Sequence, residues 1–155
     1  VCYRYFALPK SPRLQVKITD AFHFINQTTH QYDLLFIDLF INDDVPKWPS
    51  SFFSLCRQRL KNKKSVLICN FLTGGSKDLL FEFLTQVAAS FDQHTIILPT
   101  KNGENYILFA FPETIEFPTS WVMFQKILNI EKKIRFPFSQ IWNDVSQLVL
   151  AASKS

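Results

Sequence analysis

The sequence predicts an α/β fold with a doubly wound, mostly parallel sheet that closes with a C-terminal antiparallel hairpin. Three observations carry this prediction. Apolar runs of strand length alternate along the chain with amphipathic stretches of helical length. Two of the runs, residues 32–38 and 65–71, are almost wholly apolar, which is typical of strands in a parallel sheet covered on both faces. The Asn102-Gly103 pair separates two later runs as a hairpin turn does.

The expected elements follow in order. Residues 13–18 alternate apolar and polar side chains and predict a half-buried strand. Asp20 and Ser76 are predicted N-caps of the helices over residues 21–27 and 77–90, and Ser50 or Ser51 of the helix between them. The remaining predicted elements are strands over residues 32–38, 65–71, 95–98 and 106–111, and helical stretches over residues 119–130 and 137–152.

Length and composition predict one globular domain over residues 1–155, with 47% hydrophobic and 19% charged residues. The net charge of +4 is spread along the chain, and its densest basic run, residues 61–64, falls at a predicted helix end. We therefore expect no nucleic-acid partner. No apolar run reaches the roughly 18 to 20 residues of a membrane span, so we expect no membrane partner.

The three cysteines, Cys2, Cys56 and Cys69, are odd in number and form no CxxC pair. This argues against a disulfide framework and against a zinc site. The sequence therefore predicts a cytoplasmic protein without a metal.

Four segments together resemble the spermidine synthase (polyamine aminopropyltransferase) family, which has the class I S-adenosylmethionine-dependent methyltransferase fold. They are RYFALPKSPRLQV (residues 4–16), ITDAFHFI (18–25), YDLLFIDLF (32–40) and VPKWPSSFFSLCRQRLKNKKSVLICN (45–70). They occur in the order of the family, and the resemblance extends over residues 4–111. It implies that the ligand is S-adenosylmethionine or its decarboxylated form.

The resemblance assigns the cofactor-binding role to Asp20 and Ala21. Ligands of open α/β sheets bind beyond the carboxyl ends of the strands. In the family, the residue at Asp20 accepts a hydrogen bond from the adenine amino group, and the backbone N–H at Ala21 donates to a ring nitrogen. The residues alone also allow Asp20 to be no more than a helix N-cap.

The candidate catalytic residues are Asp38, Asp43 and Asp44. Asp38 ends a predicted strand and is expected to hold a substrate ammonium. In the family a second aspartate three positions later deprotonates the attacking amine, but here that position is Ile41, which cannot take a proton. Asp43 or Asp44 is the expected substitute. The alternative reading of all three is an ordinary acidic turn.

Two features of the family are missing from the sequence. The Gly-rich loop after the first strand and the acidic residue that ends the second strand have no counterpart, and the chain has only Gly74, Gly75 and Gly103. The sequence thus predicts a fold that lacks its first two strands. Without them, residues 32–38 would form an open sheet edge, which invites pairing with another chain. We therefore expect either a further N-terminal segment or a homo-oligomer.

Three functions remain open from the sequence. The leading one is transfer of an aminopropyl group from a sulfonium nucleoside to a polyamine. The alternative with the same fold is S-adenosylmethionine-dependent methyl transfer, which Ile41 slightly favours. The third is a degenerate, non-catalytic member of the family that acts as an interaction subunit.

Overall fold

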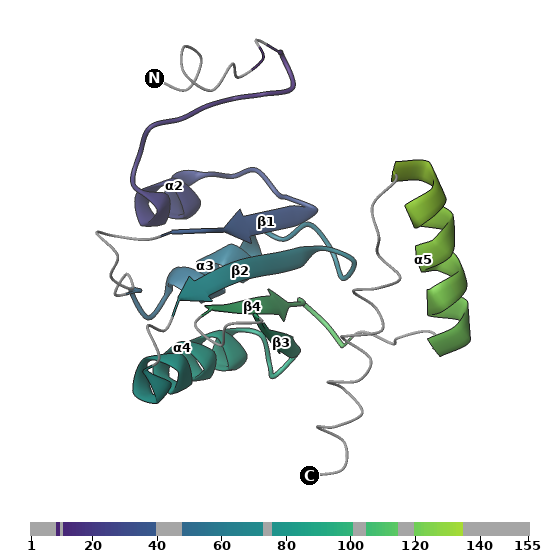
Figure 1. Ribbon diagram of the computed structural model, residues 1–155. Coiled ribbons are helices and arrows are strands. Elements are labelled where there is room, and N and C mark those ends of the chain that lie inside the picture. Colours follow the sequence, from purple (N-terminus) through teal and green to yellow (C-terminus); the bar gives the residue numbers. More distant parts are fainter. Residues whose placement is uncertain are drawn as a thin grey trace.

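The structure is a computed structural model that describes residues 9, 11–39, 48–72, 76–100, 105–114 and 120–134 (Figure 1). Within this part of the chain, four strands form one sheet in the order β1-β2-β4-β3. The elements are α2 (Ala21–Gln27), β1 (Leu34–Ile37), α3 (Phe52–Gln58), β2 (Val66–Leu72), α4 (Lys77–Ser90), β3 (Thr95–Pro99), β4 (Asn105–Ala110) and α5 (Ser120–Ile134).

The sheet confirms the predicted fold class. β1 runs parallel to β2, and β4 runs antiparallel to both β2 and β3, so three of the four strands point the same way. The predicted hairpin exists, but its antiparallel strand does not lie at the edge of the sheet. β4 is inserted between β2 and β3, where its residues Leu108 and Ala110 are fully buried.

One face of the sheet forms the core. Side chains along β2 alternate between buried and half-buried, and the register places Leu67 and Cys69 of β2 beside Ala110 and Leu108 of β4. Helices α2, α3 and α4 contribute to the same apolar cluster. The buried apolar residues are Ile25, Ile37, Phe52, Phe53, Cys56, Leu60, Leu67, Cys69, Phe71, Phe83, Val87, Phe91, Leu108 and Ala110.

Aromatic rings join the helices to the sheet. Phe53 is fully buried and meets Phe52 and Phe83 edge to face, with ring centroids 5.3 and 5.5 Å apart. Phe83 of α4 stacks on Phe71 of β2 at 3.8 Å between ring centroids. Such ring pairs stabilise a core beyond the area they bury.

Two arginines connect elements that are distant in the sequence. Arg57 of α3 donates from Nη1 to the Ser90 carbonyl (3.0 Å), and from Nη2 to the Asp92 carboxylate (2.6 Å) and the Pro112 carbonyl (2.9 Å). Arg59 donates from Nε to the carbonyl of Ile25 near the end of α2 (3.2 Å). A cation at a helix C-terminus also suits the helix dipole.

The caps agree with the prediction in two of three helices. The Asp20 carboxylate accepts from the His23 N–H (2.8 Å), and the Ser76 hydroxyl accepts from the Leu79 N–H (3.3 Å). Ser51 occupies the N-cap position of α3 but makes no side-chain cap bond. Its backbone is helical (φ −85°, ψ −7°), whereas a capping residue normally adopts an extended conformation.

The predicted strand over residues 13–18 is wrong. This segment is irregular and runs outside the sheet to the start of α2 (Figure 1), and Ile18 is fully exposed. A strand needs a neighbour for its backbone hydrogen bonds, and the described sheet ends at β1. An alternating pattern alone does not supply that neighbour.

The buried strand predicted over residues 32–38 is shorter and more exposed than expected. β1 contains four residues, of which Leu34 and Phe36 are 52% and 61% exposed, while Ile37 is buried. Within the described sheet, β1 is therefore an edge strand that is covered on one face.

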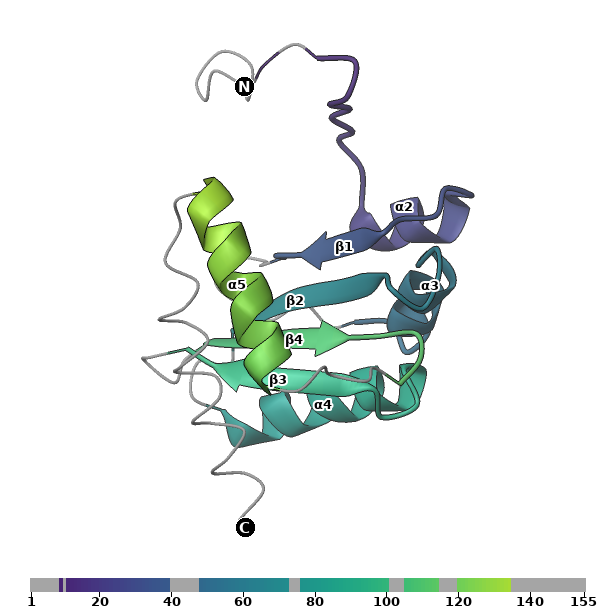
Figure 2. The ribbon, with the colours of Figure 1, turned by 90° about the vertical axis from the view of Figure 1, so that its right-hand side faces the viewer.

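The helix predicted over residues 119–130 is confirmed as the longer α5 (Figure 2). In Figure 2, α5 stands on the opposite side of the sheet from α2 and α3. None of the helices that the structure describes combines the length and the apolar character needed to cross a membrane. The Asn102-Gly103 turn and the helix predicted over residues 137–152 lie outside the described residues.

Candidate functional site

The candidate site lies at the sheet edge where β1 and β2 end. Both strands point toward this edge, and α2 begins on the same side (Figure 1). In open α/β sheets this edge is the usual place for a ligand. The structure therefore brings the start of α2, with Asp20 and Ala21, to the same side of the molecule as Asp38.

Asp20 is exposed and serves as the N-cap of α2, as its bond to the His23 N–H shows. One carboxylate oxygen, Oδ1, makes this bond. Ala21 follows as the first helical residue and is half-buried. Its backbone N–H belongs to the first turn, where N–H groups have no partner within the helix.

Asp38 contacts a residue that the sequence reasoning did not select. The Asn70 Nδ2 donates a hydrogen bond to Asp38 Oδ1 at 2.9 Å. The parallel register explains this contact. Ile37 pairs with Cys69, so the next residues of the two strands lie side by side on the face opposite the core.

A signal for Asn70 was present in the sequence. The first apolar run ends in Asp38, and Asn70 is a polar residue near the end of the second. The constant offset between paired residues of β1 and β2 aligns Asp38 with Asn70. The Cys69-Asn70-Phe71 segment departs from the pattern of the spermidine synthase family. The structure shows that the amide of Asn70 is next to the candidate carboxylate.

The other candidate catalytic residues, Asp43 and Asp44, lie outside the described residues, as does Ile41. The nearby Cys69 is not a nucleophile. Burial, with smaller contributions from the charges of Cys56 and Asp38, raises the pKa of its thiol to about 12. Only the thiolate is reactive, so this side chain stays neutral and inert near neutral pH.

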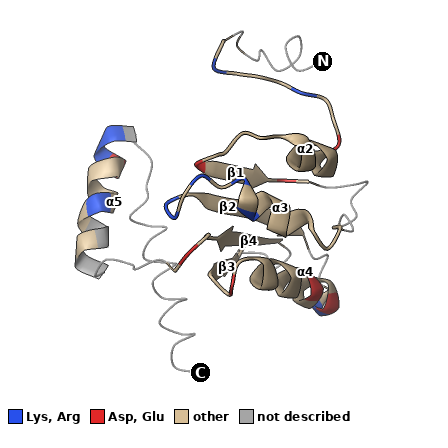
Figure 3. Cartoon of the chain, turned by 180° about the vertical axis from the view of Figure 1, so that it is seen from behind, with Lys and Arg blue, Asp and Glu red and all other residues tan. Residues whose placement is uncertain are grey.

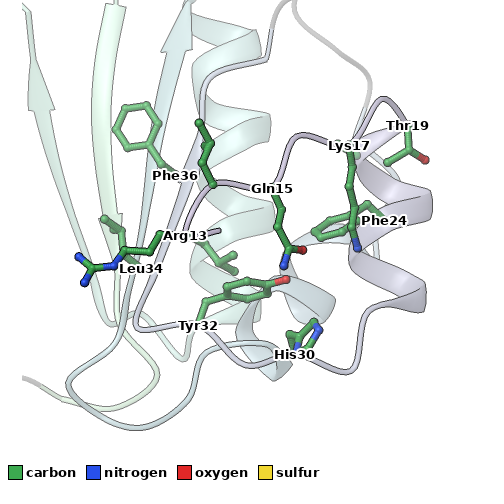
Figure 4. A pocket seen from close by; sticks show the side chains of 12 residues that line it. Arg13, Gln15, Lys17, Thr19, Phe24, His30, Tyr32, Leu34 and Phe36 are labelled. Carbon is green, nitrogen blue, oxygen red and sulfur yellow. The ribbon is translucent and has the colours of Figure 1, made fainter. Parts of the chain in front are cut away.

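An open cavity of about 720 Å³ lies between residues 13–19 and β1 (Figure 4). This volume is within the range of small-molecule sites. Of the predicted site residues, Ala21 lines the cavity and Asp20 and Asp38 do not. The residues labelled in Figure 4 are Arg13, Gln15, Lys17, Thr19, Phe24, His30, Tyr32, Leu34 and Phe36.

The cavity combines positive charge with aromatic surface. Arg13 and Lys17 both line it, and Lys17 Nζ lies 5.2 Å from the centroid of the Phe24 ring. A second hollow of about 510 Å³ shares Lys17 and Phe24 with it and extends toward His23. This lining suits a ligand with both an aromatic part and a negative group.

Charged side chains do not gather on one face of the described elements. Figure 3 shows basic residues on α5 and in the turn before β2, and acidic residues at the start of α4. Among the described residues, no three His, Cys, Asp or Glu side chains come close enough together to hold a metal ion.

The fold is similar to that of a known methyltransferase. The crystal structure of human methyltransferase-like protein 13 in complex with SAH (S-adenosylhomocysteine) matches with a TM-score of 0.69 and 19% sequence identity, over 86% of this chain and 64% of that chain. This chain thus spans less than two thirds of that crystallised chain. No protein-family profile and no curated protein sequence matches this chain. The fold is therefore that of the S-adenosylmethionine-dependent methyltransferases, and the spermidine synthase resemblance rests on the sequence motifs.

Proposed function

We propose that this chain belongs to an S-adenosylmethionine-dependent methyltransferase. The observation that carries the proposal is the likeness of its fold to a methyltransferase crystallised with SAH. Asp20 and Ala21 at the start of α2 and Asp38 directly after β1 lie at the edge where ligands of open α/β sheets usually bind, which supports the proposal. Methyl transfer, the alternative from the sequence, therefore replaces aminopropyl transfer as the leading reading.

The cavity supports the same choice of ligand. S-adenosylmethionine carries a carboxylate, which its decarboxylated form lacks. Arg13 and Lys17 line the cavity beside β1 and would pair with this carboxylate. In this arrangement the adenine lies near Ala21, with its amino group donating to Asp20 and its ring nitrogen accepting from the Ala21 N–H.

In methyl transfer the protein mainly has to position the nucleophile against the methyl group of S-adenosylmethionine. The lone pair of a nucleophile attacks the methyl carbon, the carbon–sulfur bond breaks, and its electrons return to the sulfonium sulfur to give neutral S-adenosylhomocysteine. In our proposal the nucleophile is an amine, which Asp38 binds as an ammonium and which reacts after losing a proton. The base is assigned to Asp43 or Asp44 on the strength of the sequence alone.

Calorimetric titration of the full-length protein tests this function. We expect saturable binding of S-adenosylmethionine and S-adenosylhomocysteine, and weaker binding of decarboxylated S-adenosylmethionine. Lys17→Met is expected to lower the affinity for S-adenosylmethionine and to leave that for the decarboxylated form unchanged. Preference for the decarboxylated form would restore aminopropyl transfer to a polyamine, and no binding of either would favour a non-catalytic interaction subunit.

A matched pair of variants tests the role of Asp20. Asparagine is as good an N-cap as aspartate, so Asp20→Asn keeps α2 intact while removing the negative acceptor. We expect this variant to bind S-adenosylmethionine about tenfold more weakly, the size of one charge-assisted hydrogen bond. Asp33→Asn makes the same aspartate-to-asparagine change directly before β1, away from the candidate site. This control variant is expected to bind S-adenosylmethionine with wild-type affinity. Equal affinity of both variants for S-adenosylmethionine would show that Asp20 acts only as the N-cap of α2 and does not bind the ligand.

Homo-oligomer formation through β1 is the second part of the proposal. β1 is the edge strand of the described sheet, and its Leu34 and Phe36 side chains are largely exposed. Such an edge pairs readily with a second copy. Size-exclusion chromatography with light scattering is expected to show a dimer that Phe36→Lys weakens. A monomeric 155-residue chain would contradict this part.

A further inference from the structure

The side chain of Asn70 has one polar atom that no described residue hydrogen-bonds. Its Nδ2 donates to Asp38 Oδ1 at 2.9 Å, but its Oδ1 is buried and accepts no hydrogen bond from the described residues. Buried polar atoms are nearly always paired, because losing water without gaining a partner costs free energy. The unpaired oxygen is therefore a candidate acceptor for a group outside the described residues.

The surroundings give no structural reason for an amide at this position. Asn70 lies on the face of β2 opposite the core, where its strand neighbours on that face are Ile68 and Leu72. Its partner on β4 is Ile107. An apolar side chain would pack among these residues without a polar atom to satisfy. The contact with Asp38 is the one use of the amide among the described residues.

The contact also fixes which way the amide faces. A carboxylate can only accept hydrogen bonds, so the NH₂ group of Asn70 must be the part that meets Asp38. The carbonyl oxygen of Asn70 is then held as a second acceptor on the same side chain. Two acceptors on adjacent strands suit a group with at least two N–H donors.

We propose that Asn70 holds the Asp38 carboxylate in place, and that its Oδ1, which is covered in the free protein, becomes exposed when the acceptor amine binds and accepts from a second N–H of that amine. This inference rests on the proposed function and adds to it a selectivity for nitrogen acceptors. A primary amine has enough N–H groups to reach both oxygens. An alcohol has one O–H and leaves one acceptor unpaired, so it binds less well.

NMR titration of the full-length, ¹⁵N-labelled protein measures this selectivity without any methyl donor. The probes are n-butylamine, which has the amino group of a lysine side chain, spermidine, and n-butanol as the matched alcohol. The Asn70 side-chain NH₂ signals, assigned by their loss in Asn70→Leu, and the backbone signals of residues 37–39 report binding. We expect saturable shifts with both amines and none with the alcohol.

The variants separate the amine site from a purely structural role. Leucine is close to asparagine in size and matches the apolar neighbours, so Asn70→Leu is expected to fold normally. It should weaken amine binding about tenfold, as should Asp38→Asn, and the double variant should be little weaker than either. Asp33→Asn, the charge-matched control beyond the other end of β1, should change binding less than about twofold.

Each outcome decides the inference. Saturable binding of n-butylamine would support a site for any primary amine, and binding of spermidine alone would support one for free polyamines. Absence of saturable shifts, equal binding of n-butanol, or wild-type affinity in Asn70→Leu would overturn it. Calorimetry with S-adenosylmethionine on the same samples keeps the two proposals distinct. Loss of donor binding with amine binding intact would overturn only the proposed function.

Discussion

Two regions of the molecule differ in how completely their side chains are covered. The packed half consists of α3, α4, β2, β3 and β4, and contains all of the largest fully buried side chains, among them Phe53, Phe91 and Leu67. The open half consists of residues 11–20, α2 and β1. Here Ile18, Leu34 and Phe36 are more than half exposed, while Ile25 and Ile37 anchor the half to the core.

The difference separates stability from function. Buried apolar area supplies most of the free energy of folding, so the packed half is expected to hold the fold together. The larger cavity and the exposed strand edge belong to the open half. Of the predicted site residues that the structure describes, Asp20 and Ala21 belong to it and Asp38 directly follows its strand β1. Asn70 is the exception, because it belongs to β2 of the packed half and contacts Asp38 at the border.

The largest expected effect is the loss of a core ring. Phe53→Ala removes a fully buried side chain that contacts Phe52 and Phe83, and should lower the free energy of unfolding by about 3 to 5 kcal/mol. Phe36→Ala, which removes the same ring from a 61% exposed position of the open half, should cost less than about 1 kcal/mol. Urea denaturation measures both. Equal decreases in the free energy of unfolding for the two variants would contradict the claim that the packed half stabilises the fold more than the open half.

A smaller loss is expected from Arg57, the polar link within the packed half. Arg57→Ala leaves the carbonyls of Ser90 and Pro112 without their donor and should cost about 1 to 3 kcal/mol. Arg13→Ala changes an exposed arginine of the open half and serves as the control, with an unchanged denaturation midpoint expected. An unchanged midpoint in Arg57→Ala would show that the link carries no stability.

A still smaller effect is a pH dependence of the same link. The hydrogen bond and charge of Arg57 lower the pKa of Asp92. A lowered pKa in the folded state stabilises the protein above the unfolded-state pKa, and this contribution is lost as the pH falls through the folded-state pKa. Asp92→Asn, which tolerates the positive φ of 51° equally well, should therefore be less stable than wild type at neutral pH and equal to it in acid. Denaturation midpoints at both pH values measure the difference. A gap that persists in acid would contradict the assignment.

The smallest expected effect concerns the two buried cysteines, which should not be alkylated in the folded protein. Burial raises the pKa of the Cys56 and Cys69 thiols to about 12, so both should resist iodoacetamide in the folded protein at mildly alkaline pH. Mass spectrometry of the peptides that contain Cys56 and Cys69 measures the extent of alkylation. In urea both should react. Fast labelling of Cys69 in the folded protein would show that the border between the halves opens.

The packed half was the more predictable from sequence. The apolar run of residues 65–71 and the amphipathic pattern of residues 77–90 predict β2 and α4 closely, because each element buries its apolar side chains against the others. Residues 13–18 have an equally clear alternating pattern, yet form no strand, because a strand depends on a hydrogen-bonding neighbour. The place of β4 between β2 and β3 likewise follows from long-range pairing, which short sequence patterns do not encode.

The candidate site was predictable only in part. Asp20 and Asp38 follow from their places at the start of a helix and at the end of a strand, and the structure brings both to the ligand edge. Asn70 becomes visible only when the register of β1 and β2 is known. The charged cavity beside β1 depends on the path of residues 13–19, which the sequence pattern assigned to the sheet.

Hydrogen–deuterium exchange of the full-length protein, with and without S-adenosylhomocysteine, tests the central claim most directly. If the open half binds the nucleoside and the packed half is its scaffold, the ligand should slow exchange in residues 19–24 and 34–39 and leave α4 and β3 unchanged. Protection confined to the packed half, or no protection at saturating ligand, would contradict the claim that the open half is the ligand site.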